Sequence, residues 1–218
     1  QCEASFKQGT RFTAWARQGD DSRYVHPFSL PAEYATLNLA EHWLATDGSV
    51  PFADFVTPQA AVIEAGLAPK QPATPEYAFN VNYGYHFDAG KFAKLLHEHA
   101  VGRLGVRYVS GNLQQVQSRA DGDIAAIVLD TGDRLAGDLF VDCTGQRALL
   151  IGRYPEAGFV PVKDVLFNDA AIAVQVPYTD RKQALPSGTC ATAVSSGWIW
   201  DSGLQTRRGV GHVYSSAH

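Results

Sequence analysis

Residues 83–109, YGYHFDAGKFAKLLHEHAVGRLGVRYV, decide the fold class that the sequence predicts. A short aromatic strand at 83–87 comes first, and Asp88 can then cap a helix that runs to about Leu104. One face of that helix gathers apolar residues at helical spacing, namely Phe92, Leu95, Leu96 and Ala100. Residues 106–109 read as a second short strand, so the stretch predicts a strand-helix-strand unit.

A change from helical to strand periodicity follows this unit. Leu113–Arg119, Ile124–Leu129 and Arg134–Asp142 alternate as three strands joined by Gly-containing turns, which predicts a β-meander. The end of the last strand, Asp138–Cys143, is dense in apolar residues, as in a central parallel strand buried on both faces. The fold class expected is therefore mixed α/β.

The turn after this strand is a candidate cofactor contact. Ligands of open α/β sheets bind beyond the carboxyl ends of strands, and Thr144-Gly145 would stand at such an end. A glycine there lets a ligand approach the backbone. The alternative interpretation is a plain turn after a buried strand. Elsewhere, residues 31–46 predict a helix that starts at Pro31, and the proline-rich residues 66–77 predict a surface loop.

Composition narrows the class of protein. The 218 residues are 45% hydrophobic and 18% charged, with a net charge of −4 and a pI near 5.9. This is a globular composition without a basic patch or an apolar run of membrane-spanning length, so neither nucleic acid nor membrane is an expected partner. Cys2, Cys143 and Cys190 are widely spaced, which favours reduced cytoplasmic thiols and no metal site.

The beginning of the sequence adds a further expectation. The chain starts at Gln1 and contains no methionine. We therefore interpret it as a piece of a longer reading frame.

Six short motifs occur in a characteristic order along the chain. They are Ser5-Phe6-Lys7-Gln8-Gly9, Tyr24-Val25-His26-Pro27-Phe28, Tyr85-His86-Phe87-Asp88-Ala89, Asp138-Leu-Phe-Val-Asp-Cys-Thr-Gly145 with Leu149-Leu150, Ser196-Gly197-Trp198-Ile199-Trp200, and Gly211-His212-Val213-Tyr214-Ser215-Ser216. In order and approximate spacing they resemble the flavin-dependent tryptophan halogenases, and the resemblance covers nearly the whole chain.

The resemblance implies a flavin-monooxygenase-like fold, incomplete in this chain, with a β-meander and a larger substrate-side sheet. It implies reduced FAD, supplied by a separate flavin reductase, and a halide ion as co-substrate. Oxygen and the reduced flavin then generate hypohalous acid, which reaches a lysine beside an aromatic substrate such as tryptophan or indole. That lysine delivers or polarises the electrophilic halogen.

Motif by motif, the resemblance assigns roles to particular residues. Lys7 matches the active-site lysine, whose amine can form a haloamine or hydrogen-bond the oxidant. His26 and Phe28 match the positions that sandwich the indole, where flat rings suit an electron-rich ligand. The alternatives are a solvated surface lysine, and a His-Pro turn beside a core phenylalanine.

The same resemblance assigns the cofactor side. Val109, Thr144 and Gly145 are the expected FAD contacts. Trp198 and Trp200 match a Trp-x-Trp signature that is thought to keep the flavin site from acting as an ordinary hydroxylase. Simple core packing is their alternative role, although alternation along a strand would put both indoles on one face.

Departures from the family pattern are also informative. Many members continue the signature with Ile-Pro, whereas Asp201, Ser202 and Gly203 follow here. No G-x-G-x-x-G fingerprint occurs in these residues, and the family's catalytic glutamate has no counterpart among them. We expect one partial domain, with residues 83–150 on the flavin side and residues 1–82 and 151–218 on the substrate side.

Three functions remain open at this point. The leading hypothesis is halogenation of an aromatic compound. The second is a flavin-dependent aromatic hydroxylase, which the altered tail of the Trp-x-Trp signature favours. The third is a non-catalytic fragment or degenerate paralogue, and even a true halogenase fragment is expected to be inactive alone.

Overall fold

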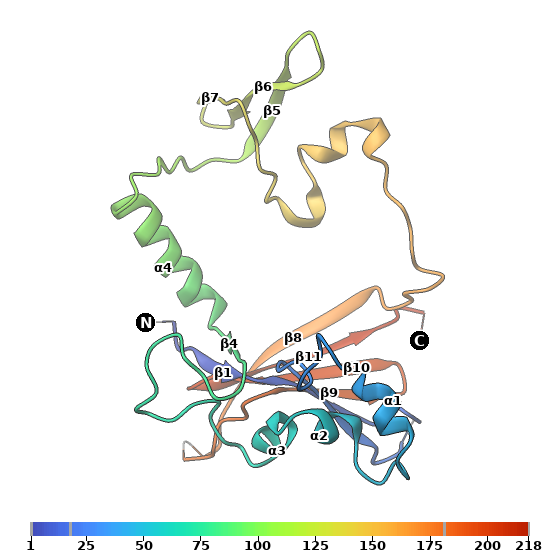
Figure 1. Cartoon of the computed structure of the whole chain (residues 1–218). Helices are drawn as coiled ribbons and strands as arrows, with labels where there is room; N and C mark the ends of the chain where they lie inside the picture. The colour runs from blue at the N-terminus through green and yellow to red at the C-terminus, as the bar shows by residue number, and fades with distance from the viewer. Residues whose placement is uncertain (1, 18, 181, 218) are drawn as a thin grey trace. The chain divides into compact units, whose positions relative to one another are not determined.

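A computed structural model describes residues 2–17, 19–180 and 182–217 of the chain (Figure 1). The fold divides into two compact units. The larger comprises Gln1–Glu98 and Lys163–His218, and the smaller comprises His99–Val162. Each unit is described by itself.

A six-stranded sheet forms the framework of the larger unit, in the order β3-β2-β9-β10-β11-β8. Its strands are β2 (Gly9–Thr13), β3 (Arg23–Pro27), β8 (Ala170–Pro177), β9 (Thr189–Val194), β10 (Gly197–Gly203) and β11 (Arg207–Tyr214). All neighbours are antiparallel except β2 and β9, which run parallel. The strands β2 and β3 are thus joined to the four strands β8 to β11 through one parallel pairing, that of β2 with β9.

A separate two-stranded ribbon joins β1 (Ser5–Lys7) to β4 (Gly84–His86) in antiparallel register. Between β3 and β4 the chain forms three short helices, α1 (Leu39–Leu44), α2 (Phe52–Val56) and α3 (Gln59–Glu64). Figure 1 shows α2 and α3 along one side of the sheet. Val56, Ala60 and Ile63 are buried there and provide much of the apolar core of this unit.

Helix α4 (Ala89–Gly102) follows β4 directly, and its first turn is anchored by charge. The Asp88 carboxylate accepts a hydrogen bond from the backbone N–H of Lys91 (3.0 Å), as an N-cap does. It also accepts one from the Arg207 guanidinium at 3.0 Å, which ties the helix start to β11. Lys91 in turn pairs with Glu3.

The smaller unit contains the meander β5 (Leu113–Ser118), β6 (Ile124–Leu129) and β7 (Arg134–Ala136). Val116, Ala126 and Leu129 are its buried apolar residues, together with Leu150. Three short 3-10 turns follow the meander, at Gly145–Arg147, Ile151–Arg153 and Pro155–Ala157. The structure therefore confirms three expectations from the sequence. These are the mixed α/β class, the helix after Asp88 and the β-meander.

Three expected elements differ in the structure. The helix predicted from Pro31 begins only at Leu39, because residues 31–37 form turns in which the Ala32 N–H donates to the Val56 carbonyl. Asn38 supplies the real cap by accepting from the N–H of Ala40. The tertiary hydrogen bond at Ala32 thus replaces the helical pattern that local periodicity favoured.

The second strand of the strand-helix-strand unit is also absent, so that prediction was wrong. Residues 106–109 carry no strand ladder, and the third meander strand ends at Ala136 rather than Asp142. Leu139 and Val141, expected to be buried on a central strand, are 84% and 77% exposed. Extended backbone becomes a strand only beside a partner, and no described strand pairs with either segment.

Packing across β10 and β11 depends on one glycine. Gly211 lies opposite Trp200, and a Cβ at Gly211 would overlap the indole atoms Cζ2 and Cη2. We expect Gly211→Ala to lower the free energy of unfolding by about 1–3 kcal/mol, the usual cost of overpacking. Gly209→Ala, in the same strand but with open space at its Cβ, should cost less than about 0.5 kcal/mol. Urea denaturation measures both, and equal effects would contradict the packing argument.

Candidate functional site

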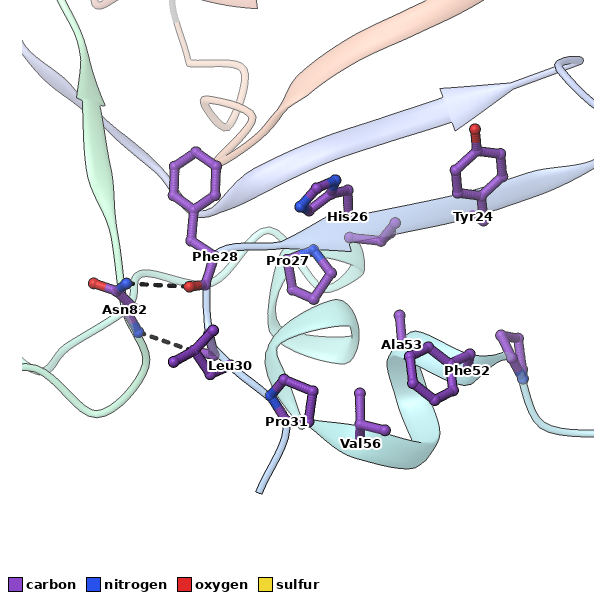
Figure 2. Close-up of a pocket in the computed structure, with 13 residues that line it drawn as sticks. Tyr24, His26, Pro27, Phe28, Leu30, Pro31, Phe52, Ala53, Val56 and Asn82 are labelled. Carbon is purple, nitrogen blue, oxygen red and sulfur yellow. Dashed lines mark hydrogen bonds between the residues drawn. The ribbon is translucent and has the colours of Figure 1, made fainter. Parts of the chain in front are cut away.

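An open apolar pocket of about 690 Å³ lies beside β3 in the larger unit (Figure 2). The walls are formed by the end of β3, the segment that follows it, and α2. The lining residues are Tyr24, Val25, His26, Pro27, Phe28, Ser29, Leu30, Pro31, Pro51, Phe52, Ala53, Val56 and Asn82. Aromatic rings, prolines and aliphatic chains dominate, as suits a flat apolar ligand.

Both residues expected to clamp an aromatic substrate line this pocket. His26 is in β3 and Phe28 follows the strand directly, so alternation puts their side chains on one side. Figure 2 shows the two rings pointing to the same side of the strand. His26 is exposed and Phe28 is half-buried. The structure therefore brings together the pair that the sequence singled out.

Lys7 joins this pair from a different strand. Its Nζ atom lies 5.7 Å from the centroid of the Phe28 ring, within cation–π range. Gly84 stands opposite Lys7 in the β1/β4 register, and the Phe28 ring lies 3.5 Å from where a Cβ at Gly84 would stand, an ordinary van der Waals distance. The β1/β4 ribbon thus runs directly beside the Phe28 ring.

His86 is a site residue that sequence reasoning missed. It lies opposite Ser5 on the face of the β1/β4 ribbon that also carries Lys7, and it is only 8% exposed. Its Nε2 atom is 2.9 Å from the Thr189 hydroxyl, whereas its Nδ1 is buried without a partner. Burial first, and then the positive charge of Lys7, lower the pKa of His86 from 6.5 to about 4. A neutral imidazole therefore adjoins the lysine.

An aromatic row leads from the pocket to the Trp-x-Trp signature. Tyr24 of the pocket stacks on Phe12 at 4.9 Å, and Phe12 meets Trp15 edge-on at 5.5 Å between ring centroids. Trp15 is 6.1 Å from Trp198, which is 6.1 Å from Trp200. The expected shared face of the two tryptophans is confirmed, and Trp15 extends this row of rings toward the pocket.

The residues after the signature, where the chain departs from the family pattern, are also packed. Asp201 forms an ion pair with Arg208 across the β10/β11 hairpin. Gly203 accepts a hydrogen bond from the Ser5 hydroxyl at 2.7 Å. A Cβ at Gly203 would meet Pro186 at 2.8 Å and the Tyr178 hydroxyl at 3.0 Å. The packing around position 203 therefore leaves no room for a side chain.

The expected flavin contacts lie in the smaller unit, around a carboxylate. Asp142 accepts from the Thr144 hydroxyl (2.6 Å), from the Thr144 N–H (3.0 Å) and from the N–H groups of Leu150 and Ile151. These donors, the Thr144 hydroxyl foremost, lower the pKa of Asp142 to about 2. The carboxylate therefore stays ionised near neutral pH and holds the residues from Thr144 to Ile151 in a closed turn.

Within that turn, Gly145 has a φ of +64° and open space where a Cβ would stand. An accessible backbone of this kind fits close approach by a flat cofactor. Val109 is half-buried in the same unit. The residues present are thus compatible with a flavin at the Thr144–Gly145 turn, although the assignments of Val109, Thr144 and Gly145 stay predictions.

The part of the chain that the structure describes holds neither a cluster of metal-binding side chains nor a membrane-spanning helix. Within it, no three His, Cys, Asp or Glu side chains gather as a metal site would require. Its helices are all too short or too polar to cross a bilayer.

Comparison with known proteins places this geometry in a family. The profile of the family described as tryptophan halogenase matches residues 1–218, the whole chain. This chain belongs to the tryptophan halogenase family. Among curated relatives, tryptophan 7-halogenase RebH of Lentzea aerocolonigenes is 32% identical and tryptophan 6-halogenase ThaL of Streptomyces albogriseolus is 33% identical, each over 99% of the chain. The chain spans 43% of the length of either relative.

Solved structures of the family agree with the fold. A tryptophan halogenase from Shewanella frigidimarina matches 100% of the chain with a TM-score of 0.94 and 45% identity, over 42% of its own length. The flavin-dependent halogenase Xcc4156 from Xanthomonas campestris matches 100% of the chain with a TM-score of 0.86 and 36% identity, over 43% of its length. The mixed α/β fold therefore corresponds to part of a flavin-dependent halogenase.

The buried His86 predicts a pH dependence of stability. In the unfolded chain this histidine takes up a proton near pH 6.5, whereas in the folded chain it does so only near pH 4. Between these values the unfolded state binds more protons, so stability falls as the pH drops. We expect a loss of about 1–2 kcal/mol between pH 7 and pH 5 from this group.

Urea denaturation at both pH values checks this. His86→Gln, which has no titrating ring, should reduce the difference between pH 7 and pH 5. The control is His42, an exposed histidine on α1. His42→Gln should leave the difference in stability between pH 7 and pH 5 unchanged. An undiminished pH effect in His86→Gln would show that His86 is not the group responsible.

Proposed function

We propose that this chain is part of a flavin-dependent halogenase that acts on tryptophan, indole or another electron-rich aromatic compound, with residues 83–150 on its flavin side and residues 1–82 and 151–218 on its substrate side. The observation that carries the proposal is the placement of Lys7 Nζ 5.7 Å from the Phe28 ring, at a pocket that also presents His26. Family membership supports the reaction class. The relatives RebH and ThaL, a tryptophan 7-halogenase and a tryptophan 6-halogenase, support an aromatic substrate.

The reaction requires a halogen donor at the ring and an acceptor for one proton. Hypohalous acid transfers its halogen to a ring carbon, the carbon loses its proton, and that proton leaves with the hydroxide as water. Lys7 would hold the oxidant by hydrogen bonding or carry the halogen as a haloamine. Phe28 and His26 would orient the substrate ring by stacking, so that the reacting carbon faces the lysine.

When bound, reduced FAD supplies the two-electron chemistry with oxygen that turns halide into hypohalous acid. The Thr144–Gly145 turn and Val109 would hold it, with Asp142 keeping the turn closed. We propose a separate flavin reductase as the source of reduced flavin, and a cytoplasmic setting for both proteins.

One observation favours a second candidate, a flavin-dependent aromatic hydroxylase. The tail of the tryptophan signature is Asp201, Ser202 and Gly203, with Asp201 engaged by Arg208. If this tail alters how the oxygen activated by reduced flavin is used, oxygen rather than halogen would enter the product. Product mass measured with and without bromide separates the two functions.

The first test replaces Lys7. In the protein that carries this chain, Lys7→Ala should abolish halogenated product while reduced flavin continues to consume oxygen, because no flavin step requires the lysine. Lys7→Arg should not restore the product, since a guanidinium stays protonated and cannot form a comparable haloamine. Oxygen uptake and product mass spectrometry with bromide and indole measure both activities. Retained halogenation in Lys7→Ala would move the assignment to the hydroxylase or to a non-catalytic protein.

The second test concerns the aromatic clamp. Phe28→Ala should lower kcat/KM for the aromatic substrate. The fall should correspond to a loss of about 1–3 kcal/mol of transition-state stabilisation, the cost of losing a stacked ring. Flavin oxidation in the absence of substrate should hardly change. If several aromatic substrates gave unaltered kinetics, Phe28 would be a packing residue only.

A further inference from the structure

Gln59, the first residue of α3, is completely buried and bonded at both ends of its amide. Its exposed fraction is 0%, and it does not belong to the pocket wall. The side-chain oxygen accepts a hydrogen bond from the Ser29 N–H at 2.5 Å. The side-chain nitrogen donates to the Asn82 carbonyl at 2.5 Å. Burial of an amide is costly unless both ends are satisfied, so this geometry joins two segments of the chain specifically.

Those two segments meet at the pocket and contact each other directly. The Asn82 N–H donates to the Ser29 hydroxyl at 3.0 Å, and the Asn82 side-chain amide donates to the Phe28 carbonyl at 3.1 Å. Figure 2 shows Asn82 beside the backbone of Phe28. The Phe28 N–H, on the other side, donates to the Gln8 carbonyl at 2.9 Å. Both backbone polar groups of Phe28 are therefore held.

The same bridge reaches the lysine. Asn82 precedes Gly84 by two residues, and Gly84 is the register partner of Lys7. Gln8, which receives the Phe28 N–H, follows Lys7 directly. Gln59 thus links the loop that carries the Phe28 ring to the segment that leads into the strand beside Lys7. It lies 30 residues after Ser29 and 23 residues before Asn82 in the sequence.

We propose that Gln59 is a positioning residue of the aromatic pocket, which fixes the Phe28 ring relative to Lys7 without touching the substrate. This inference rests on the proposed aromatic halogenation and deepens it. Loss of the bridge would free the Ser29 and Asn82 segments to separate, so that the Phe28 ring would no longer be held in its stacking position. The effect should then appear in aromatic recognition and not in the flavin reaction.

The test is a double-mutant cycle with Phe28. Gln59→Met keeps the length of the side chain and removes both hydrogen bonds. In the protein that carries this chain, it should raise KM for indole about tenfold and leave oxygen uptake without substrate unchanged. In the Phe28→Ala background, the same replacement should change KM less than twofold, because the ring through which it acts is gone.

A matched control separates positioning from stability. Ser215 is a buried polar residue whose hydroxyl accepts from the Ala217 N–H, away from the pocket. Ser215→Ala should lower the unfolding temperature yet leave KM unaltered when assayed well below that temperature. Should Gln59→Met fail to fold, Asn82→Ala, at an exposed position, removes the bond to the Phe28 carbonyl and should raise KM in the same direction.

The outcomes also distinguish this proposal from the proposed function. Ligand-observed NMR with indole measures affinity without turnover, and Gln59→Met should weaken that affinity about tenfold. If the unaltered protein produces no halogenated indole but binds indole in a Gln59-dependent way, the halogenase assignment fails and the positioning role stands. A tenfold KM effect that is equal in both Phe28 backgrounds, or an unchanged KM and affinity in Gln59→Met, would overturn the positioning role.

Discussion

The hydrogen bonds of Gln8 are the constraint on which the geometry of the larger unit depends. This residue is fully buried between β1 and β2, and its N–H donates to the Ser187 carbonyl at 2.7 Å. Its carbonyl accepts from Phe28, and its side-chain amide donates to the Leu67 carbonyl at 2.7 Å. Four segments that are distant in sequence therefore meet at one residue. Because Lys7 precedes Gln8, its place beside Phe28 follows from these bonds.

The charge distribution around Lys7 complements this rigidity. The lysine lies beside an aromatic ring and a neutral, buried imidazole, and no carboxylate pairs with it among the residues that the structure describes. An ion pair would hold the amine away from a ligand, whereas the ring face stabilises it weakly and leaves its hydrogens available. His86 is kept neutral by burial and by Lys7 itself, so a second positive charge is excluded from the site.

Exposed apolar surface gathers in two segments that no described strand pairs with. Leu139 and Val141 follow the meander, and Phe159–Phe167 connects the smaller unit to β8 with most of its large apolar side chains in solvent. A segment buries its side chains on both faces only when it lies inside a sheet that is covered on both sides. Neither segment therefore has the cover that its apolar sequence alone would predict.

The sequence by itself determined those features that depend only on residues close together in the chain. The apolar period of α4, the Asp88 cap and the alternation of the meander act within a few positions, and the structure contains all three. The placement of Trp198 and Trp200 on one face follows from strand alternation in the same way. The motif order was also sufficient to identify the family.

Only the tertiary structure decided how the site is assembled. The distance from Lys7 to Phe28, the burial of His86 and the bridge formed by Gln59 join segments 21 to 103 residues apart. No period or short motif encodes such distances, because they result from ladder register and from hydrogen bonds between loops. The same reason explains the incorrect predictions, among them the buried strand end expected at 138–142. A tertiary hydrogen bond displaced the predicted helix start at Pro31, and a strand at 106–109 requires a partner that local sequence cannot supply.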